Sequence, residues 1–261
     1  MNSTPKALLA DISRTAGLIL FTGLALAVSR VQAQDAIGFV VLVKGTASAI
    51  DADGNTRTLN RRSPILAGDT LQTGIGSALQ IRMNDNAQFS FNPGTRFRIA
   101  QYDFDDDSGT PDTALMRLQL GCFHTISGHI GEQRNDSYTI ETPAAWIGIN
   151  GTVHSACFDG AILTTATREG GTMISNQFGS IALGVGASHD YSETITGNAP
   201  GGVLNEPEVI RNFDATMNQQ ATQNSRPPAT RMNASRSLPA NSAPARDASP
   251  LAQQQDYQII P

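Results

Sequence analysis

The chain has 261 residues and a formal net charge of −5, with 24 glycines, few aromatic residues and two cysteines. An acidic chain lacks the basic face that nucleic acids or an anionic membrane surface would attract, so we exclude nucleic acid as a partner. Abundant glycine and modest charge favour a turn-rich β protein over a helical bundle, and the length is sufficient for one large all-β domain or two smaller ones.

Residues 1–33 have the pattern of a secretory signal peptide. Lys6 and Arg14 carry positive charge around the start of the apolar run at residues 15–29, and residues 31–33 (VQA) supply the small residues that signal peptidase requires. The run is shorter than the ~20 apolar residues that a spanning helix normally needs, so we expect cleavage after it and no stable membrane span. An uncleaved anchor is the alternative. After cleavage, 15 basic and 22 acidic residues would remain, and the protein would be periplasmic or secreted.

Short strand patterns alternate with turn signals throughout residues 37–192. In residues 78–83, for example, Leu79, Ile81 and Met83 share one face, which is typical of a half-exposed antiparallel strand. No segment looks like an amphipathic helix. We therefore predict an all-β domain over residues 37–192, built as a β-sandwich or a solenoid-like stack of many short strands.

The aromatic residues of this domain are expected to form its core. Phe89 and Phe91 alternate with polar residues, and Phe97 and Ile99 do the same after an Asn-Pro-Gly turn. A period of two with polar partners is the usual pattern of a strand that packs on a core, so we do not interpret these residues as a ligand-stacking platform.

Cys122 and Cys157 both lie in strand-like segments of the exported part. An oxidising compartment permits a disulfide between them, provided that neighbouring strands bring the two residues together. Two buried free thiols are the alternative. Met116, Leu118 and Leu120 precede Cys122 at alternating positions, so we expect Cys122 to point inward with them.

Residues 142–156, TPAAWIGINGTVHSA, combine a rigid entry, the single tryptophan and two closely spaced glycines. The proline fixes its own φ and keeps the residue before it extended, so the chain must change direction there. The glycines permit conformations or close approaches that a side chain would forbid. We interpret the segment as a corner between two strands, with the tryptophan in the core. The candidate interaction residues of this motif are Thr142, Pro143, Trp146, Gly148, Asn150, Gly151 and Thr152.

The composition changes towards the end of the chain. Residues 193–213 form a transition, with one short helix near Glu208. Residues 214–261 are rich in Pro, Ala, Ser, Asn and Gln and contain no glycine. Such a segment buries too little apolar surface to offset its ordering entropy, so we predict a disordered tail.

No pattern of catalytic or metal-binding residues stands out. The histidines are His124, His129, His154 and His189. They form neither an HxxxH nor an HExxH arrangement, so we expect no metal and no other cofactor. The acidic loop at residues 103–112 has its glycine one place late for a calcium loop and lacks the closing glutamate. There is no G-x-S-x-G motif, and Glu132, Glu141 and Glu169, the candidates for paired carboxylates, are better explained as surface charge.

The chain from Gly38 to Ser192 resembles the FecR domain family in the order of six segments: GFVVLVKGTASAI, LAGDTLQTG, NDNAQFSFNPGTRFRI, LQLGCFHTISG, YTIETPAAWIGINGT and EGGTMISNQFGSIALGVG. The resemblance implies an all-β module on the periplasmic side of a Gram-negative cell, without enzymatic activity. In the regulators that give the family its name, this module relays occupancy of a TonB-dependent outer-membrane receptor to a cytoplasmic sigma factor.

Two features depart from the family. Only about a dozen residues precede the apolar run, where those regulators have an anti-sigma region, and no receptor-docking domain is expected after the β domain. The family usually has arginine before the final Gly-Thr of the motif, where this chain has Asn150. The bidentate donor of that arginine would hold a carboxylate or backbone group. Its role is either structural or partner-facing, and we favour the structural role.

We predict a stand-alone exported FecR-domain protein that acts, without catalysis, as a protein-interaction or ligand-sensing module in envelope signalling. Its partner would be an unidentified envelope protein or glycan. One alternative is an envelope glycan-binding or glycan-processing protein, in which replacement of Trp146 would weaken binding. The other is a membrane-anchored regulator of a sigma factor that retains its apolar run as an anchor.

Overall fold

The computed structural model describes residues 35–105, 111–133 and 137–224. The predicted signal peptide and most of the predicted tail lie outside the described residues. Within the described part, strands dominate, which confirms the all-β prediction. No helix in these three ranges is long and apolar enough to cross a membrane.

The described residues form fifteen strands and two helices. In chain order these are β1 (Ala36–Lys44), β2 (Ala47–Ile50), β3 (Thr56–Thr58), β4 (Pro64–Leu66), β5 (Thr70–Thr73), β6 (Ala78–Met83), β7 (Gln88–Phe91), β8 (Arg96–Asp103), β9 (Thr113–Ile126), α1 (His129–Gln133), β10 (Tyr138–Glu141), β11 (Trp146–Phe158), β12 (Ile162–Asn176), β13 (Gly179–Gly184), β14 (Tyr191–Ile195), β15 (Gly201–Val203) and α2 (Glu208–Asn224).

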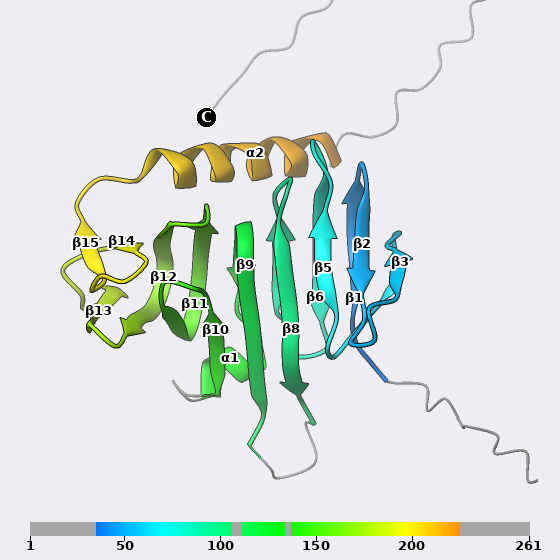
Figure 1. The fold of residues 1–261 in the computed structure, drawn as a ribbon, viewed down its shortest axis with the longest axis horizontal. Helices are drawn as coiled ribbons and strands as arrows, with labels where there is room; N and C mark the ends of the chain where they lie inside the picture. The colour runs from blue at the N-terminus through cyan, green and yellow to red at the C-terminus, as the bar shows by residue number, and fades with distance from the viewer. Residues whose placement is uncertain (1–34, 106–110, 134–136, 225–261) are drawn as a thin grey trace, which may run out of the picture. The chain divides into compact units, whose positions relative to one another are not determined.

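All the strands join one mixed hydrogen-bonded sheet that branches at β9. The first half of β9 pairs with β8, which continues through β5 and β2 to β3. Its second half pairs with β7, which continues through β6 and β1 to β4. The two branches lie one behind the other in Figure 1. β10, β11, β12, β14 and β15 extend the sheet from the other side of β9, and the β9–β10 pair is parallel.

Aromatic side chains fill the space between the two branches. The rings of Phe89, Phe91, Phe97 and Phe123 form a cluster with centroid separations of 5.1–6.1 Å, the range that aromatic pairs favour. Ile99 is fully buried beside them. The alternation in β7 and β8 therefore identified core residues correctly.

The alternation of β9 changes phase between Leu118 and Leu120, where its pairing with β8 shifts register. An extra residue in one strand shifts the following side chains by one position, so they exchange faces. Leu120 is therefore 44% exposed and Phe123 is buried. Gly121, just beyond the shift, has a φ of 90°, and a Cβ atom there would lie 2.5 Å from the Cα of Thr95. The expectation that Cys122 points into the main core was wrong, because it assumed an unbroken period of two.

The C-terminal part of the fold extends further than the sequence suggested. Strands continue past residue 192 to β15, and α2 continues past residue 213, into the segment predicted to be disordered. Ile210 and Phe213 of α2 are buried, with Met217 beside them. These three apolar residues share one face of the helix, and most of its other residues are polar. Its apolar face packs on a small cluster made by Cys122, Cys157, Ala166 and Tyr191.

Candidate functional site

A tight turn formed by residues 142–145 connects β10 to β11. The Oγ1 atom of Thr142 accepts hydrogen bonds from the backbone N–H groups of Ala144 (3.2 Å) and Ala145 (3.0 Å). The N–H of Thr142 donates to the carbonyl of Ala145 at 3.0 Å, with Pro143 following at the position where turns favour proline. The chain changes direction at the predicted residues, and the turn places Trp146 at the start of β11.

Trp146 lies on the surface, and its expected place in the core was wrong. The alternation of β11 buries Ile147 and Ile149 completely, which directs Trp146, Gly148 and Asn150 to the opposite face. The indole is 52% exposed. A period of two identifies two faces but does not say which of them meets the core, and here the two isoleucines occupy the inner one.

The outer face of β11, β12 and β13 consists mainly of small residues. Residues paired directly across antiparallel strands share a face. We call this surface the outer face. Its three cross-strand rows are Trp146, Ser175 and Ser180; Gly148, Met173 and Ala182; and Asn150, Gly171 and Gly184. Of these nine residues, only Trp146 and Met173 have large apolar side chains, and Met173 is 47% exposed.

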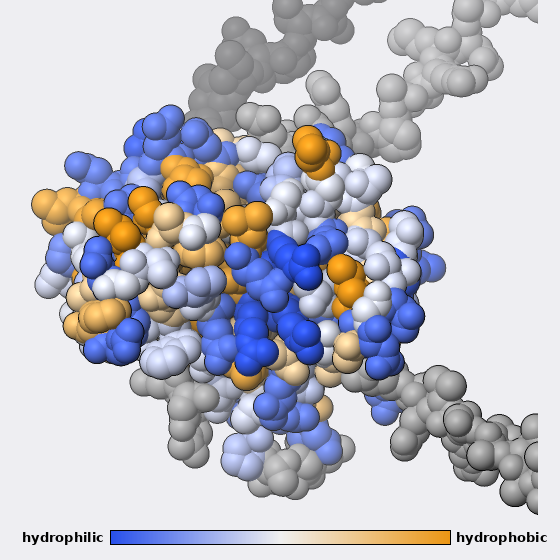
Figure 2. All heavy atoms as spheres, in the orientation of Figure 1, coloured by the Kyte–Doolittle hydropathy of each residue, from blue (hydrophilic) through white to orange (hydrophobic). Residues whose placement is uncertain are grey.

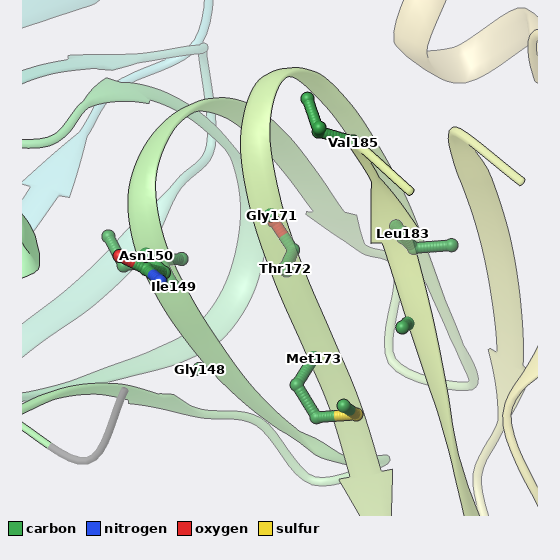
Figure 3. Close-up of a pocket in the computed structure, with 9 residues that line it drawn as sticks. Gly148, Ile149, Asn150, Gly171, Thr172, Met173, Leu183 and Val185 are labelled. Atoms are coloured by element: carbon green, nitrogen blue, oxygen red, sulfur yellow. The ribbon is translucent and has the colours of Figure 1, made fainter. Parts of the chain in front are cut away.

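The first hollow on this surface lies over the middle of the outer face (Figure 3). Gly148, Asn150 and Met173 line it together with Leu183 and Val185 of the neighbouring strand and turn. Gly148, Gly171 and Ala182 are among its lining residues, and their small size brings the main chain close to the surface at these three positions. Hydrophobic residues also gather in Figure 2 over the end of the molecule that β13 to β15 form, whereas hydrophilic residues lie over β8 and β9.

A bulge separates the last predicted motif residues from the outer face. The pairing of β11 with β12 shifts register after Asn150, and Gly151 has a φ of 57°. Gly170 must be a glycine, because a Cβ there would lie 2.0 Å from the carbonyl oxygen of Gly151. Beyond the bulge, Thr152 is buried, and its N–H donates to Ser127 Oγ at 2.9 Å. Thr152 is therefore a structural residue and not part of a surface site.

Asn150 is exposed, and its side chain makes no hydrogen bond with the described residues. An arginine at this position would extend from the outer face towards solvent. The location therefore favours a partner-facing role for that side chain over the structural role expected from the sequence.

The second hollow lies beside the turn and has a volume of about 410 Å³. Trp146 forms one part of its lining, and Phe178, 51% exposed, forms another. The Nδ2 group of Asn176 donates to the carbonyls of Ala144 (3.0 Å) and Asn198 (2.7 Å), which holds the rim together. Sequence reasoning missed Phe178. The only available signal was an aromatic residue in the Asn-Gln-Phe-Gly turn between β12 and β13.

The two cysteines are direct cross-strand neighbours in β9 and β11. Their Cα atoms lie 4.1 Å apart, and the structure joins Cys122 to Cys157 in a disulfide. The bond forms part of the surface on which α2 packs. The sequence left this pairing open because it depends on strand register.

A polar cluster beneath α2 contains histidine, serine and aspartate. The Oγ atom of Ser155 lies 3.0 Å from Nδ1 of His124 and donates to Asp214 at 3.2 Å. Asp214 also pairs with Arg168 at 2.7 Å, and Arg168 pairs with Glu206. Burial lowers the pKa of His124. In a hydrolytic triad the histidine lies between serine and aspartate. Here the fully buried serine lies between the other two, so the order of the three groups differs from that of a triad. The contacts of Asp214 tie α2 to β11 and β12.

His154 is fully buried and its ring lies edge-on to Phe123, with centroids 5.2 Å apart. Burial, with a smaller contribution from His124, lowers the pKa of His154 to about 3. No group of three or more His, Cys, Asp or Glu side chains suited to a metal ion occurs among the described residues. Residues 106–110 of the acidic loop lie outside the described residues.

Residues 69–171 match the model of the FecR protein family, which confirms the resemblance over that part of the chain. The match runs from β5 into β12 and includes the motif. No curated protein matches the chain. Two crystal structures of a candidate anti-sigma factor from Parabacteroides distasonis ATCC 8503 are similar, with 12% and 14% identity and TM-scores of 0.39 and 0.40 over 52% of this chain. The chain covers 60% of the length of that protein.

Proposed function

We propose that this chain, whose residues 69–171 match the FecR family, is an exported, non-enzymatic module that binds a partner protein in envelope signalling. The family match is the observation that carries the proposal, because FecR modules relay signals through protein contacts. The signal-peptide pattern of residues 1–33 supports a periplasmic or secreted location. The arrangement of Ser155 between His124 and Asp214 supports a role without catalysis.

The edge of β13 is the part of the molecule best suited to receive a partner strand. β13 pairs with β12 along one side, from Gly171–Gly184 to Asn176–Gly179, and its other side has no strand partner among the described residues. Natural edge strands are usually protected by charge, proline or a bulge. The sequence of β13, GSIALG, carries no charge and no proline. An incoming strand would gain backbone hydrogen bonds along this edge up to Gly184, whose N–H already donates to the carbonyl of His189 at 3.0 Å.

The surface beside this edge offers contacts for side chains of such a strand. Met173 is 47% exposed on the outer face, and Val185, directly after β13, is 84% exposed. Both line the first hollow. Strand addition supplies affinity through the main chain and specificity through neighbouring pockets, and this region combines both elements.

The test uses the chain from residue 34 onwards, immobilised and exposed to an envelope extract of the source cells under mild cross-linking. We expect at least one protein that wild type recovers and that Ala182→Lys loses, since a lysine in the middle of β13 opposes edge pairing. Thr58→Lys is the matched control, because Thr58 is an exposed residue of another edge strand, β3. Binding of the purified partner should weaken at least about tenfold with Ala182→Lys only, which corresponds to about 1.4 kcal/mol.

Three outcomes would contradict the proposal: no specific partner, equal effects of the two lysine substitutions, or turnover of an envelope polymer by the purified chain. The location is tested separately by N-terminal sequencing of the exported protein. A mature start at Gln34 would support export with cleavage, and a start before residue 33 would support a retained anchor.

A further inference from the structure

We infer that the second hollow, between Trp146 and Phe178, binds a neutral, β-linked oligosaccharide of glucose-type sugars, with the indole as the stacking surface. The inference adds a ligand to the protein-binding role and rests on that proposal only for its envelope location. The hollow and the β13 edge use different residues, so each site can be tested without the other.

Exposed aromatic surface is concentrated in this hollow. One exposed apolar side chain on a protein surface needs no explanation. Here Trp146 and Phe178 are both about half exposed, at 52% and 51%, and they line the same hollow from different parts of the chain. The cross-strand partner of Trp146 is Ser175, and the next residue in that row is Ser180. Because both are small, no bulky side chain in that row stands beside the indole.

The lining of the hollow is neutral. Its residues are Thr142, Pro143, Ala144, Ala145, Trp146, Asn176, Gln177, Phe178, Thr196 and Gly197. None of these side chains is charged, so a phosphate, an acidic peptide or a basic segment would lose hydration without gaining an ion pair. The exposed amide of Gln177 remains to exchange hydrogen bonds with an uncharged ligand. The hydroxyl of Thr196 donates to the carbonyl of Ala161 at 2.9 Å, so towards a ligand it acts as an acceptor.

Aromatic faces together with neutral hydrogen-bonding groups match the chemistry of a sugar ring. The face of an aromatic ring is electron-rich and attracts the weakly positive hydrogen atoms of C–H groups. In β-linked glucose-type sugars the hydroxyls are equatorial, so both faces of each ring present C–H groups and the chain is nearly flat. The hydroxyls at the ring edge then point towards the polar rim. A site of about 410 Å³ falls within the size range of small-molecule sites.

The walls of the hollow are held in place before any ligand arrives. Asn176 links the turn at Ala144 to the loop at Asn198 through its two Nδ2 hydrogen bonds. Its Oδ1 atom accepts the backbone N–H of Phe178 at 2.9 Å, which fixes the position of that aromatic residue. Preformed walls reduce the ordering cost of binding, so even a shallow site can retain an oligosaccharide.

The test exploits the fact that Trp146 is the only tryptophan of the chain. Its fluorescence therefore reports on this hollow alone. Titration of the chain from residue 34 onwards with cellotetraose and with N-acetylchitotetraose should give a saturable change in emission with at least one of them. Maltotetraose, which is α-linked and curved, should bind at least about fivefold more weakly. A Kd near 1 mM or below is expected, which is within reach of a shallow site.

Isothermal titration of variants then assigns the binding to the two rings. Trp146→Ala and Phe178→Ala should weaken binding by about tenfold and fivefold, whereas Trp146→Phe should retain most of it because an aromatic face remains. Leu204→Ala is the matched control, since Leu204 is exposed but lies outside the second hollow. Circular dichroism checks that each variant is folded.

The inference is overturned if neither β-linked probe changes the emission up to about 10 mM, or if maltotetraose binds as well as they do. It is also overturned if the two alanine variants bind as wild type does. Ala182→Lys should leave sugar binding unchanged. If the wild-type chain recovers no protein partner but binds sugar, only the proposed strand-edge site is rejected. If it recovers a partner that Ala182→Lys loses but binds no sugar, only the glycan site is rejected.

Discussion

Replacement of His154 by leucine is expected to make the protein less sensitive to acid. His154 is completely buried, and neither of its ring nitrogens has a hydrogen-bond partner among the described residues. Burial lowers its pKa from the ordinary 6.5 to about 3. The folded protein therefore keeps this imidazole neutral throughout the mildly acidic range, while the unfolded chain takes up a proton near its ordinary pKa.

The sign and size of the effect follow from this difference in pKa. Above pH 6.5 both states hold a neutral His154 and the stability is unaffected. Below pH 6.5 only the unfolded chain binds the proton, so the free energy of unfolding falls by about 1.4 kcal/mol for each pH unit. The loss is about 2 kcal/mol at pH 5 and reaches about 5 kcal/mol near the folded pKa of about 3. His124, whose pKa is also lowered by burial, contributes in the same direction.

The assay is urea unfolding at several pH values between about 7.5 and 5, where most carboxylates stay ionised. In His154→Leu the slope of stability against pH should decrease by about one proton, and stability at neutral pH should stay within about 1 kcal/mol of wild type, because no hydrogen bond is lost. His129→Leu, at an exposed position, is the control. The reasoning is refuted if the slope is unchanged, or if His154→Leu loses more than about 2 kcal/mol at neutral pH, since that loss would reveal a hydrogen bond to the imidazole.

Two further pairs of substitutions test the packing of α2 and the close approach of Gly121 in β9 to Thr95. Phe213→Ala should lower the free energy of unfolding by about 3–4 kcal/mol in urea unfolding, because Phe213 is 1% exposed. Met217 is only half-buried, so Met217→Ala should lower it much less. Equal losses in the two variants would contradict the packing of α2. Gly121→Ala should lower the free energy of unfolding by at least about 3 kcal/mol in the same assay, because strain at positive φ adds to a clash with Thr95. Gly151 also has a positive φ but has open space around it, so Gly151→Ala should lower the free energy of unfolding by only about 1–2 kcal/mol. Similar losses in the two glycine variants would contradict the close contact in β9.

Much of the fold was predictable because its signals are local. Period-two patterns identified the strands, and they placed Phe89, Phe91 and Phe97 in the core, since a strand that faces a core on one side must alternate. The turn at Thr142 followed from the proline after it. The order of short segments indicated the FecR family before any contact between strands was known, and the match over residues 69–171 agrees with it.

The predictions that failed depended on a second element. α2 has few apolar residues, and Ile210 and Phe213 form a helix face only because the strands beneath provide an apolar surface for it. The local sequence shows that this segment is mostly polar, but it does not show the apolar surface of the strands on which the helix packs. The short helix predicted near Glu208 is present, but composition favoured disorder from residue 214 onwards, whereas α2 continues to Asn224.

The candidate sites show the same difference between what neighbouring residues determine and what contacts between distant strands determine. Sequence alone was enough to establish an acidic all-β chain with a FecR-like motif around a single tryptophan, because composition and alternation are properties of neighbouring residues. Tertiary structure decided that Trp146 faces solvent beside Phe178, that Cys122 meets Cys157 and that the edge of β13 is open. The first two outcomes depend on strand register or on which face meets the core, and a shift of one residue would have reversed them, whereas the third depends on the order of the strands in the sheet.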